Sequence, residues 1–130
     1  MSPELLRLCF DTVERIHLPD AVARWIARLV AASHPDAPEA PAVVRDYVRY
    51  GASPRAAIAM AEAARAIALL DGRPSVGFED VRAVAVPVLN HRLIPTYQAR
   101  VDHQTTASIA AALLDAVDEA GIDLPADIKA

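Results

Sequence analysis

An arginine stands in the first turn of a predicted helix, within the stretch GASPRAA at residues 51–57. Ser53 is a favourable N-cap residue and Pro54 suits the first helical position, so we expect the helix to begin here. Because the N-terminal end of a helix carries roughly half a positive charge, a cation such as Arg55 is unfavourable in this turn. A bound anion would remove that cost, since the free N–H groups of the helix end and the planar guanidinium both suit phosphate oxygens. Arg55 is therefore a candidate anion-binding residue.

Arg55 also has a simpler interpretation. Its long side chain can extend into solvent and form an ion pair with Glu62 or Asp46. One arginine at one helix start does not decide between the two interpretations, so both stay open on these residues alone.

The other residue types that carry chemistry are scattered along the chain. The histidines are His17, His34, His91 and His103. None of them stands three or four residues from another histidine or from an evident set of carboxylate ligands, so we expect no metal site.

A serine hydrolase is a further alternative, because Asp102 and His103 precede Ser108. However, no strand–turn–helix elbow surrounds Ser108, and serine suits the first turn of a helix. The sequence also contains neither GxxxxGK(S/T) nor GxGxxG, two glycine-rich motifs that bind phosphates. We therefore expect no catalysis by these 130 residues alone.

The composition indicates one globular domain. The chain has 130 residues, of which 54% are apolar and 23% charged, and this length is enough to bury a core. Aromatic residues make up 5% and the net charge is −4, which argues against single-stranded nucleic-acid stacking and against a broad basic footprint. No apolar run reaches the roughly 18 residues of a membrane span, and no signal-peptide pattern opens the chain, so we expect a cytoplasmic location.

Cys9 is the sole cysteine, so we expect neither an internal disulfide nor a cysteine-based metal site. It stands among Leu5, Leu6, Leu8 and Phe10. In that context the expected role of Cys9 is that of a small, buried apolar side chain.

Helix-start signals and apolar periodicity predict an all-α bundle of about five helices. We expect a core over residues 3–94 and a C-terminal helix in the segment 102–121, with Thr105 or Thr106 as its cap and Gly121 at its end. Residues 34–41 contain three prolines and must form a loop. Residues 42–50 are ambiguous between a short strand and a helical turn.

Two of the predicted helices are expected to supply the centre of the domain. The helix from Pro54 to Asp71 is apolar nearly all round, which is typical of a helix surrounded by others. Gly72 is expected to end it as the C′ residue. In the second helix, Trp25 is expected in the core.

Residues 51–93 resemble the C-terminal lid domain of the MoxR family of AAA+ ATPases. The shared elements are the Gly-Ala-Ser-Pro-Arg-Ala start at 51–56, the Gly-Arg turn at 72–73, the Asp-Val pair at 80–81 and the Val-Leu-Asn-His-Arg-Leu segment at 88–93. The helices predicted before residue 35 are similar in spacing, and residues 94–121 resemble the family's C-terminal end. The resemblance implies that residues 1–130 form a single helical, AAA+ lid-like domain.

This resemblance implies a role for Arg55 as the sensor 2 residue of an ATPase. In AAA+ ATPases the sensor 2 arginine reaches from the lid toward the terminal phosphates of ATP, so Arg55 would be the catalytic residue that this chain contributes to the intact protein. Gly51, Ala52, Ser53 and Pro54 would set the geometry of its helix start and would form the cofactor-binding segment with it.

Arg92 is a second candidate within the resemblance, for a subunit interface or a phosphate. An arginine in the last turn of a helix can also satisfy free carbonyl groups there. Both roles of Arg92 stay open on the sequence.

The family's nucleotide-binding α/β domain is missing from this sequence, together with its Walker A and Walker B motifs, sensor 1 and arginine finger. The resemblance therefore implies ATP with Mg²⁺ as the cofactor of the intact protein, and no tight cofactor binding by this fragment. It further implies an upstream α/β ATPase domain, a homo-oligomeric ring, and partner proteins with von Willebrand factor A domains in a chaperone-like maturation machine.

A stand-alone helical protein–protein interaction module is the alternative from another functional class. The Phe-Glu-Asp-Val helix start at 78–81 also occurs after a turn in histone-like folds, which share a short–long–short plan of helices. The net charge of −4 argues against a DNA-wrapping version of this plan but not against protein assembly.

Overall fold

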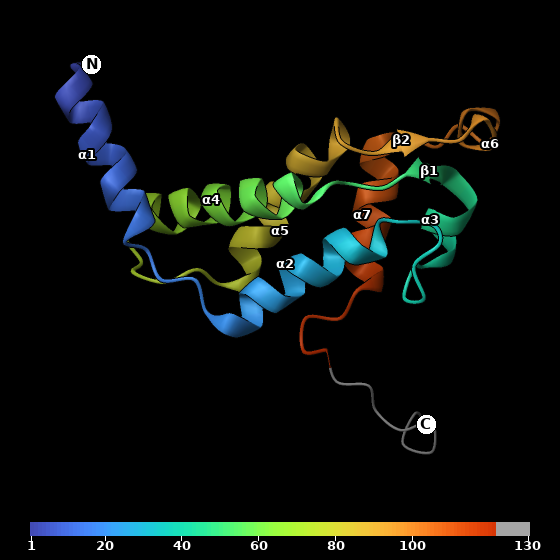
Figure 1. Cartoon of the computed structure of the whole chain (residues 1–130), viewed down its shortest axis with the longest axis horizontal. Coiled ribbons are helices and arrows are strands. Elements are labelled where there is room, and N and C mark those ends of the chain that lie inside the picture. The colour runs from blue at the N-terminus through green and yellow to red at the C-terminus, as the bar shows by residue number, and fades with distance from the viewer. Residues whose placement is uncertain (122–130) are drawn as a thin grey trace.

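The computed structural model describes residues 1–121, which form a mainly helical bundle (Figure 1). The elements of the described chain are α1 (Pro3–Glu14), α2 (Asp20–Ala32), α3 (Ala42–Tyr47), β1 (Val48–Tyr50), α4 (Pro54–Leu70), α5 (Phe78–Asn90), β2 (Ile94–Pro95), α6 (Tyr97–Val101) and α7 (Thr106–Ala116). The predicted all-α class is confirmed. The two helices beyond the expected five are the short α3 and α6.

Helix α4 lies across the middle of the bundle and packs against α5, α2 and α1 (Figure 1). Its buried residues are Ala56, Met60, Ala64 and Ala68, each four positions after the last. The short alanine side chains on this line let neighbouring helices approach α4 closely. The central place predicted for this helix is confirmed, although Leu70 at its end is 82% exposed.

Trp25 of α2 lies in the core and is fully buried, as predicted. Its ring packs edge-to-face on Phe78 at the start of α5, with the ring centroids 5.7 Å apart. Its indole N–H donates to the carbonyl of Val117 at 3.0 Å. This hydrogen bond satisfies the polar atom of the ring inside the core and joins α2 to the end of α7.

The turn between α4 and α5 places a glycine in the left-handed region, since Gly72 has a φ of +72°. The Gly72 N–H donates to the Leu69 carbonyl at 2.9 Å, and the Arg73 N–H donates to the Ala68 carbonyl at 2.8 Å. These bonds satisfy two carbonyl groups that the end of a helix otherwise leaves free. The predicted role of Gly72 as the C′ residue is confirmed.

The ambiguous residues 42–50 divide between helix α3 and strand β1. Strand β1 pairs antiparallel with β2, and Tyr50 lies opposite Ile94. Because β1 ends at Tyr50, the loop that leads into α4 begins directly at Gly51. The small sheet thus positions the segment that leads into α4.

The C-terminal helix is shorter than the range expected for it. Thr105 caps α7, because its hydroxyl accepts a hydrogen bond from the Ser108 N–H at 3.0 Å. Helix α7 ends at Ala116. The next residue, Val117, has an extended backbone conformation, and its carbonyl accepts the hydrogen bond from Trp25. The predicted cap at Thr105 is confirmed. The segment from Leu124 onward, for which the position at the chain end predicts fraying, lies outside the described residues.

Helix α1 projects from one end of the bundle (Figure 1) and buries none of its residues. Its side chains Leu8 and Phe10 are each 60% exposed. The expectation that Cys9 is buried is wrong, because this residue is exposed as well. The periodicity of α1 correctly identifies an apolar stripe. Helix α4 lies beside this stripe, but its contact leaves every residue of α1 at least partly exposed.

Candidate functional site

Arg55 is exposed in the first turn of α4. Within residues 1–121 its guanidinium forms no ion pair, so neither Glu62 nor Asp46 is its partner there. The ion pair that the sequence left open for Arg55 is therefore absent from the described structure. The side chain is available to a group from outside these residues.

The helix end beside Arg55 has no side-chain cap. Ser53 occupies the N-cap position with extended backbone and Pro54 follows in the first turn, as predicted, but the Ser53 hydroxyl accepts no hydrogen bond from the helix. In α1, by contrast, the Ser2 hydroxyl accepts a hydrogen bond from the Leu5 N–H at 3.2 Å. The N–H groups at the start of α4 therefore have no competing hydroxyl, which favours an incoming anion.

The loop before Arg55 is attached to the C-terminal end of α2. The Ala52 N–H donates to the Ser33 hydroxyl at 2.9 Å, and the Ala52 carbonyl lies 2.9 Å from Nε2 of His34. The Ser33 hydroxyl in turn donates to the Val30 carbonyl at 2.6 Å. Both polar backbone atoms of Ala52 are thus held by two consecutive residues of another element.

Gly51 allows this close contact between the loop and α2. A Cβ atom at this position would lie 2.6 Å from the Ser33 carbonyl oxygen and 2.8 Å from Cγ of His34. Cβ atoms essentially never lie this close to non-bonded atoms, so any side chain at Gly51 would push the loop away from α2. Glycine is needed at position 51 because the neighbouring atoms leave no room for a side chain.

A cavity of about 370 Å³ adjoins the loop. It is lined by His34, Pro35, Asp36, Arg49, Tyr50 and Gly51. The guanidinium of Arg49 lies over the Tyr50 ring, 5.3 Å from its centroid. A cationic side chain and an aromatic ring therefore stand immediately before the Arg55 helix start.

Arg92 does not belong to this segment. It lies just after α5 and donates from Nη1 to the Val88 carbonyl at 2.8 Å. This is the carbonyl-satisfying role that the sequence left open for it. Its side chain also borders a groove of about 780 Å³ between α1, α4 and α5.

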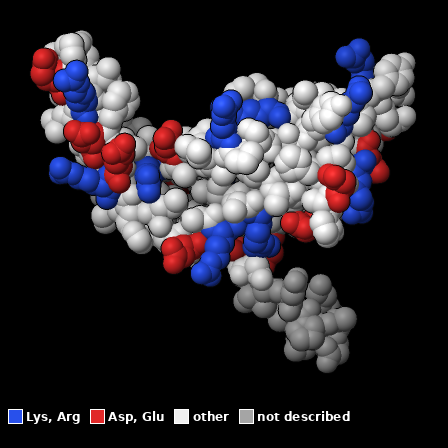
Figure 2. Space-filling view, viewed as in Figure 1, with Lys and Arg blue, Asp and Glu red and all other residues white. Residues whose placement is uncertain are grey.

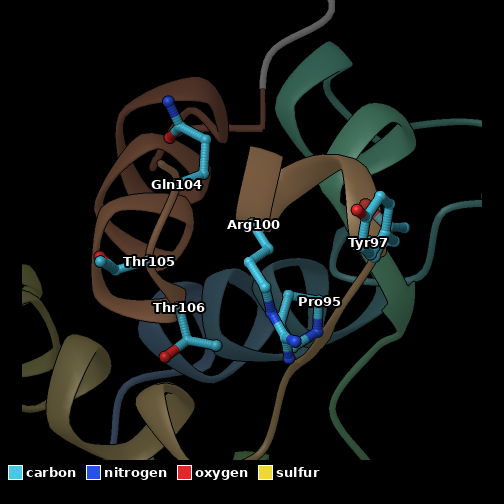
Figure 3. A pocket seen from close by; sticks show the side chains of 7 residues that line it. Pro95, Tyr97, Arg100, Gln104, Thr105 and Thr106 are labelled. Atoms are coloured by element: carbon cyan, nitrogen blue, oxygen red, sulfur yellow. The ribbon is translucent and has the colours of Figure 1, made fainter. Parts of the chain in front are cut away.

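A third cavity, of about 380 Å³, lies between β2, α6 and the start of α7 (Figure 3). Arg100 extends into it from α6 toward Pro95, with Thr105 and Thr106 on the opposite side. None of the residues singled out from the sequence as a binding residue lines this cavity. It is therefore separate from the Arg55 segment.

The hydrolase alternative finds no support in the described geometry. The Ser108 hydroxyl donates to the Thr105 carbonyl at 2.9 Å and serves the start of α7. Asp102 accepts hydrogen bonds from the Tyr47 hydroxyl and the Gln98 amide, each at 2.9 Å. The carboxylate holds the pKa of Tyr47 above its ordinary value, chiefly by accepting that hydrogen bond.

Charged side chains of both signs are mixed over the face shown in Figure 2. Among residues 1–121, no three metal-binding side chains gather into one group. No helix in the described part of the chain is long and apolar enough to cross a membrane.

Sequence reasoning placed the Arg55 segment but missed Ser33 and His34. On the sequence, His34 is only one of four scattered histidines, and Ser33 is not singled out. The available signal was Gly51, because an isolated glycine before a helix can mark a close backbone approach. No pattern in the sequence indicates which residues approach Gly51.

Comparison with known proteins agrees with the resemblance of residues 51–93. Residues 40–119 match the AAA lid domain family. Over 118 residues the chain is 32% identical to Chaperone MoxR1 of Mycobacterium tuberculosis, covering 85% of this chain and 31% of that protein. Over 113 residues it is 35% identical to Protein MoxR of Paracoccus denitrificans, covering 85% of this chain and 30% of that protein.

A crystal structure of a candidate ATPase from Cytophaga hutchinsonii has a similar fold. Its TM-score with this chain is 0.78 at 31% sequence identity, and the match covers 83% of this chain and 33% of that one. The chain thus spans about a third of the length of each of these relatives. With more than half of its residues matched by the family, the chain belongs to the AAA lid domain family.

Proposed function

We propose that this chain is the lid of a MoxR-type AAA+ ATPase and that Arg55 is its sensor 2 residue. The observation that carries the proposal is an exposed arginine, without an ion-pair partner in the described residues, beside a helix end that no side chain caps. A guanidinium without an ion-pair partner in the described residues and a helix N-terminus without a side-chain cap both suit the terminal phosphates of a nucleotide. The MoxR relatives support the same assignment.

In this proposal the chain supplies one part of a phosphoryl-transfer site. Arg55 would contact the γ-phosphate of ATP bound mainly by an α/β domain, and its charge would stabilise the charge that develops during transfer. The backbone of the preceding residues places Arg55 in the first turn of α4, at the N-terminal end of the helix. These residues are Gly51, Ala52, Ser53 and Pro54. Loss of the γ-phosphate removes the contact, so the lid can rotate as a rigid body.

We further propose that the intact protein hydrolyses ATP with Mg²⁺ and forms a homo-oligomeric ring with chaperone-like activity. The name of one relative, Chaperone MoxR1, supports the last part. Partner proteins with von Willebrand factor A domains belong to the same proposal. The lid would then transmit the state of the nucleotide to subunit contacts.

Substitution of Arg55 tests the sensor assignment. In the intact ATPase, Arg55→Ala is expected to lower kcat for ATP by about a hundredfold, the usual order for removing one charge-stabilising donor. Arg55→Lys keeps the charge but loses the planar fork, so an intermediate rate is expected. Steady-state phosphate release measures both effects.

The matched control is Arg24→Ala, which removes an exposed arginine from α2. It should leave kcat unchanged. Neither variant should change the thermal unfolding midpoint appreciably, because Arg55 has no partner in the described residues to lose. Unchanged turnover in Arg55→Ala would defeat the sensor assignment.

A further inference from the structure

We propose that Ser33 and His34, at the C-terminal end of α2, are positioning residues for Arg55. This inference rests on the proposed function, because it says how the sensor arginine is held in place. The two side chains bind the two polar backbone atoms of Ala52, three residues before Arg55. Neither Ser33 nor His34 lies within residues 40–119, the part matched by the lid family.

Ser33 has a fully determined hydrogen-bonding pattern. Its side chain is completely buried, and a hydroxyl carries one hydrogen to donate. That hydrogen goes to the Val30 carbonyl at 2.6 Å, which leaves an oxygen lone pair for the Ala52 N–H at 2.9 Å. The hydroxyl therefore cannot rotate without leaving a buried polar group unpaired, which is costly.

His34 completes the attachment from the other side of Ala52. A carbonyl only accepts hydrogen bonds, so Nε2 of His34 must carry the hydrogen in the 2.9 Å contact. Neutral imidazole with its hydrogen on Nε2 and protonated imidazolium both meet this requirement. The bond to Ala52 is therefore available in either charge state of His34.

The chain between Ala52 and Arg55 has little freedom to move. Ala52 is fully buried before the helix start, and Ala56 is fully buried after it. Pro54 lies between them and its ring restricts φ. Contacts on both sides thus determine where the backbone of Arg55 lies and in which direction its side chain leaves the helix.

Helix α2 gives this attachment a rigid base. Trp25 and Leu29 anchor the helix in the core, and both are fully buried. The loop is therefore positioned relative to the core through Ser33 and His34, and not only through its own short connection from β1. A shift of about 1 Å at a catalytic group can cost as much as a hundredfold in rate, so such positioning has a measurable effect.

The test is a double-mutant cycle between His34 and Arg55 in the intact ATPase. His34→Ala is expected to lower kcat for ATP roughly tenfold, a fraction of the largest misplacement effects. His34→Gln should keep most of the rate, because its amide nitrogen can replace Nε2 as the donor. In the Arg55→Ala background, His34→Ala should cause no further loss, since the group that it positions is already gone.

A purely structural role for His34 would give a different result. Its effect on kcat would then be the same with and without Arg55, and the losses would multiply. That outcome overturns the positioning role while the sensor assignment stands. If Arg55→Ala itself leaves turnover unchanged, the proposed function fails first, so the two failures are distinguishable.

Amide hydrogen exchange over residues 51–57 gives a second measurement on the same proteins. His34→Ala and Ser33→Ala should each raise exchange in this segment, and His34→Gln should restore it. His17→Ala is the matched control, because it removes another histidine side chain next to a helix, one that is exposed where His34 is half-buried. In the described structure the hydrogen bonds of His17 come from its backbone and join Pro74 and Val76, outside the loop before Arg55. Unchanged exchange in both the Ser33 and His34 alanine variants would overturn the inference, even if one variant folds poorly.

Discussion

At the residue scale, the pair Arg73 and Asp80 is the main charged contact inside the bundle. Asp80 is 2% exposed, and its two carboxylate oxygens accept hydrogen bonds from Arg73 at 2.8 and 2.5 Å. A further bond from the Gly77 N–H, at 2.8 Å, joins the carboxylate to the start of α5. The bonds from Arg73 are the main cause that holds the pKa of Asp80 below its ordinary value of 3.8.

This lowered pKa predicts how stability depends on pH. The stabilisation from Asp80 is complete above the ordinary pKa of 3.8 and is lost as the pH falls through the lower pKa of the folded state. At pH 7, Asp80→Asn should reduce the free energy of unfolding by about 1–3 kcal/mol. Urea titrations at pH 7 and about pH 3 should show the gap between wild type and variant narrowing in acid.

Asp71→Asn is the control for this prediction. Asp71 also contacts Arg73, at 3.1 Å, but its side chain is 60% exposed. Exposed ion pairs contribute little, so this variant should behave as wild type at both pH values. An equal gap at both pH values for Asp80→Asn would contradict the assignment of the lowered pKa.

The candidate site was predictable where its signals are local. Ser53, Pro54 and Arg55 could be placed at a helix start because cap residues and the first turn depend on adjacent positions. Ser33 and His34 could not, because they meet Ala52 across a loop that contains three prolines and a short helix. Their contact depends on how α2 and α4 pack, and no single-sequence pattern specifies that packing.

At the scale of elements, the turn after α4 depends on Gly72. Its positive φ is costly for a residue with a Cβ atom, although no atom within 4 Å would obstruct that Cβ. Gly72→Ala should therefore reduce the free energy of unfolding by about 1–2 kcal/mol through the backbone alone. Thermal or urea unfolding measures this loss.

Gly72→Asn is the matched variant, because asparagine adopts the left-handed region more readily than alanine. It should lose less stability than Gly72→Ala. Equal stability of Gly72→Ala and wild type would mean that the turn relaxes to another conformation without cost.

Helix starts were more predictable than burial, and also more predictable than the end of α7, which lies at Ala116 and not at Gly121. Helices α2, α4 and α5 follow local signals of caps and apolar periodicity, and the structure confirms all three. For α1 the same signals predicted the helix correctly, but the prediction that Cys9 is buried was wrong. Periodicity shows which face of a helix is apolar, but whether another element covers that face is decided by the assembly of the whole fold.

At the scale of the whole molecule, the proposed lid requires a longer polypeptide. An antibody raised against this chain should detect, in lysate of the source organism, a band more than twice the 13.9 kDa of these 130 residues. The MoxR relatives, of which the chain covers 31% and 30%, suggest the same. A band near 13.9 kDa would instead favour the stand-alone interaction module.

The exposed helix α1 has a thermodynamic consequence. An isolated helix of about a dozen residues is marginal in water, because few hydrogen bonds offset the cost of nucleation. Helix α1 has 12 residues and buries none of them, so it draws little stability from the bundle. Any surface that covers its apolar stripe also shifts its helix–coil equilibrium, and the affinity of that surface includes the free energy of completing the helix.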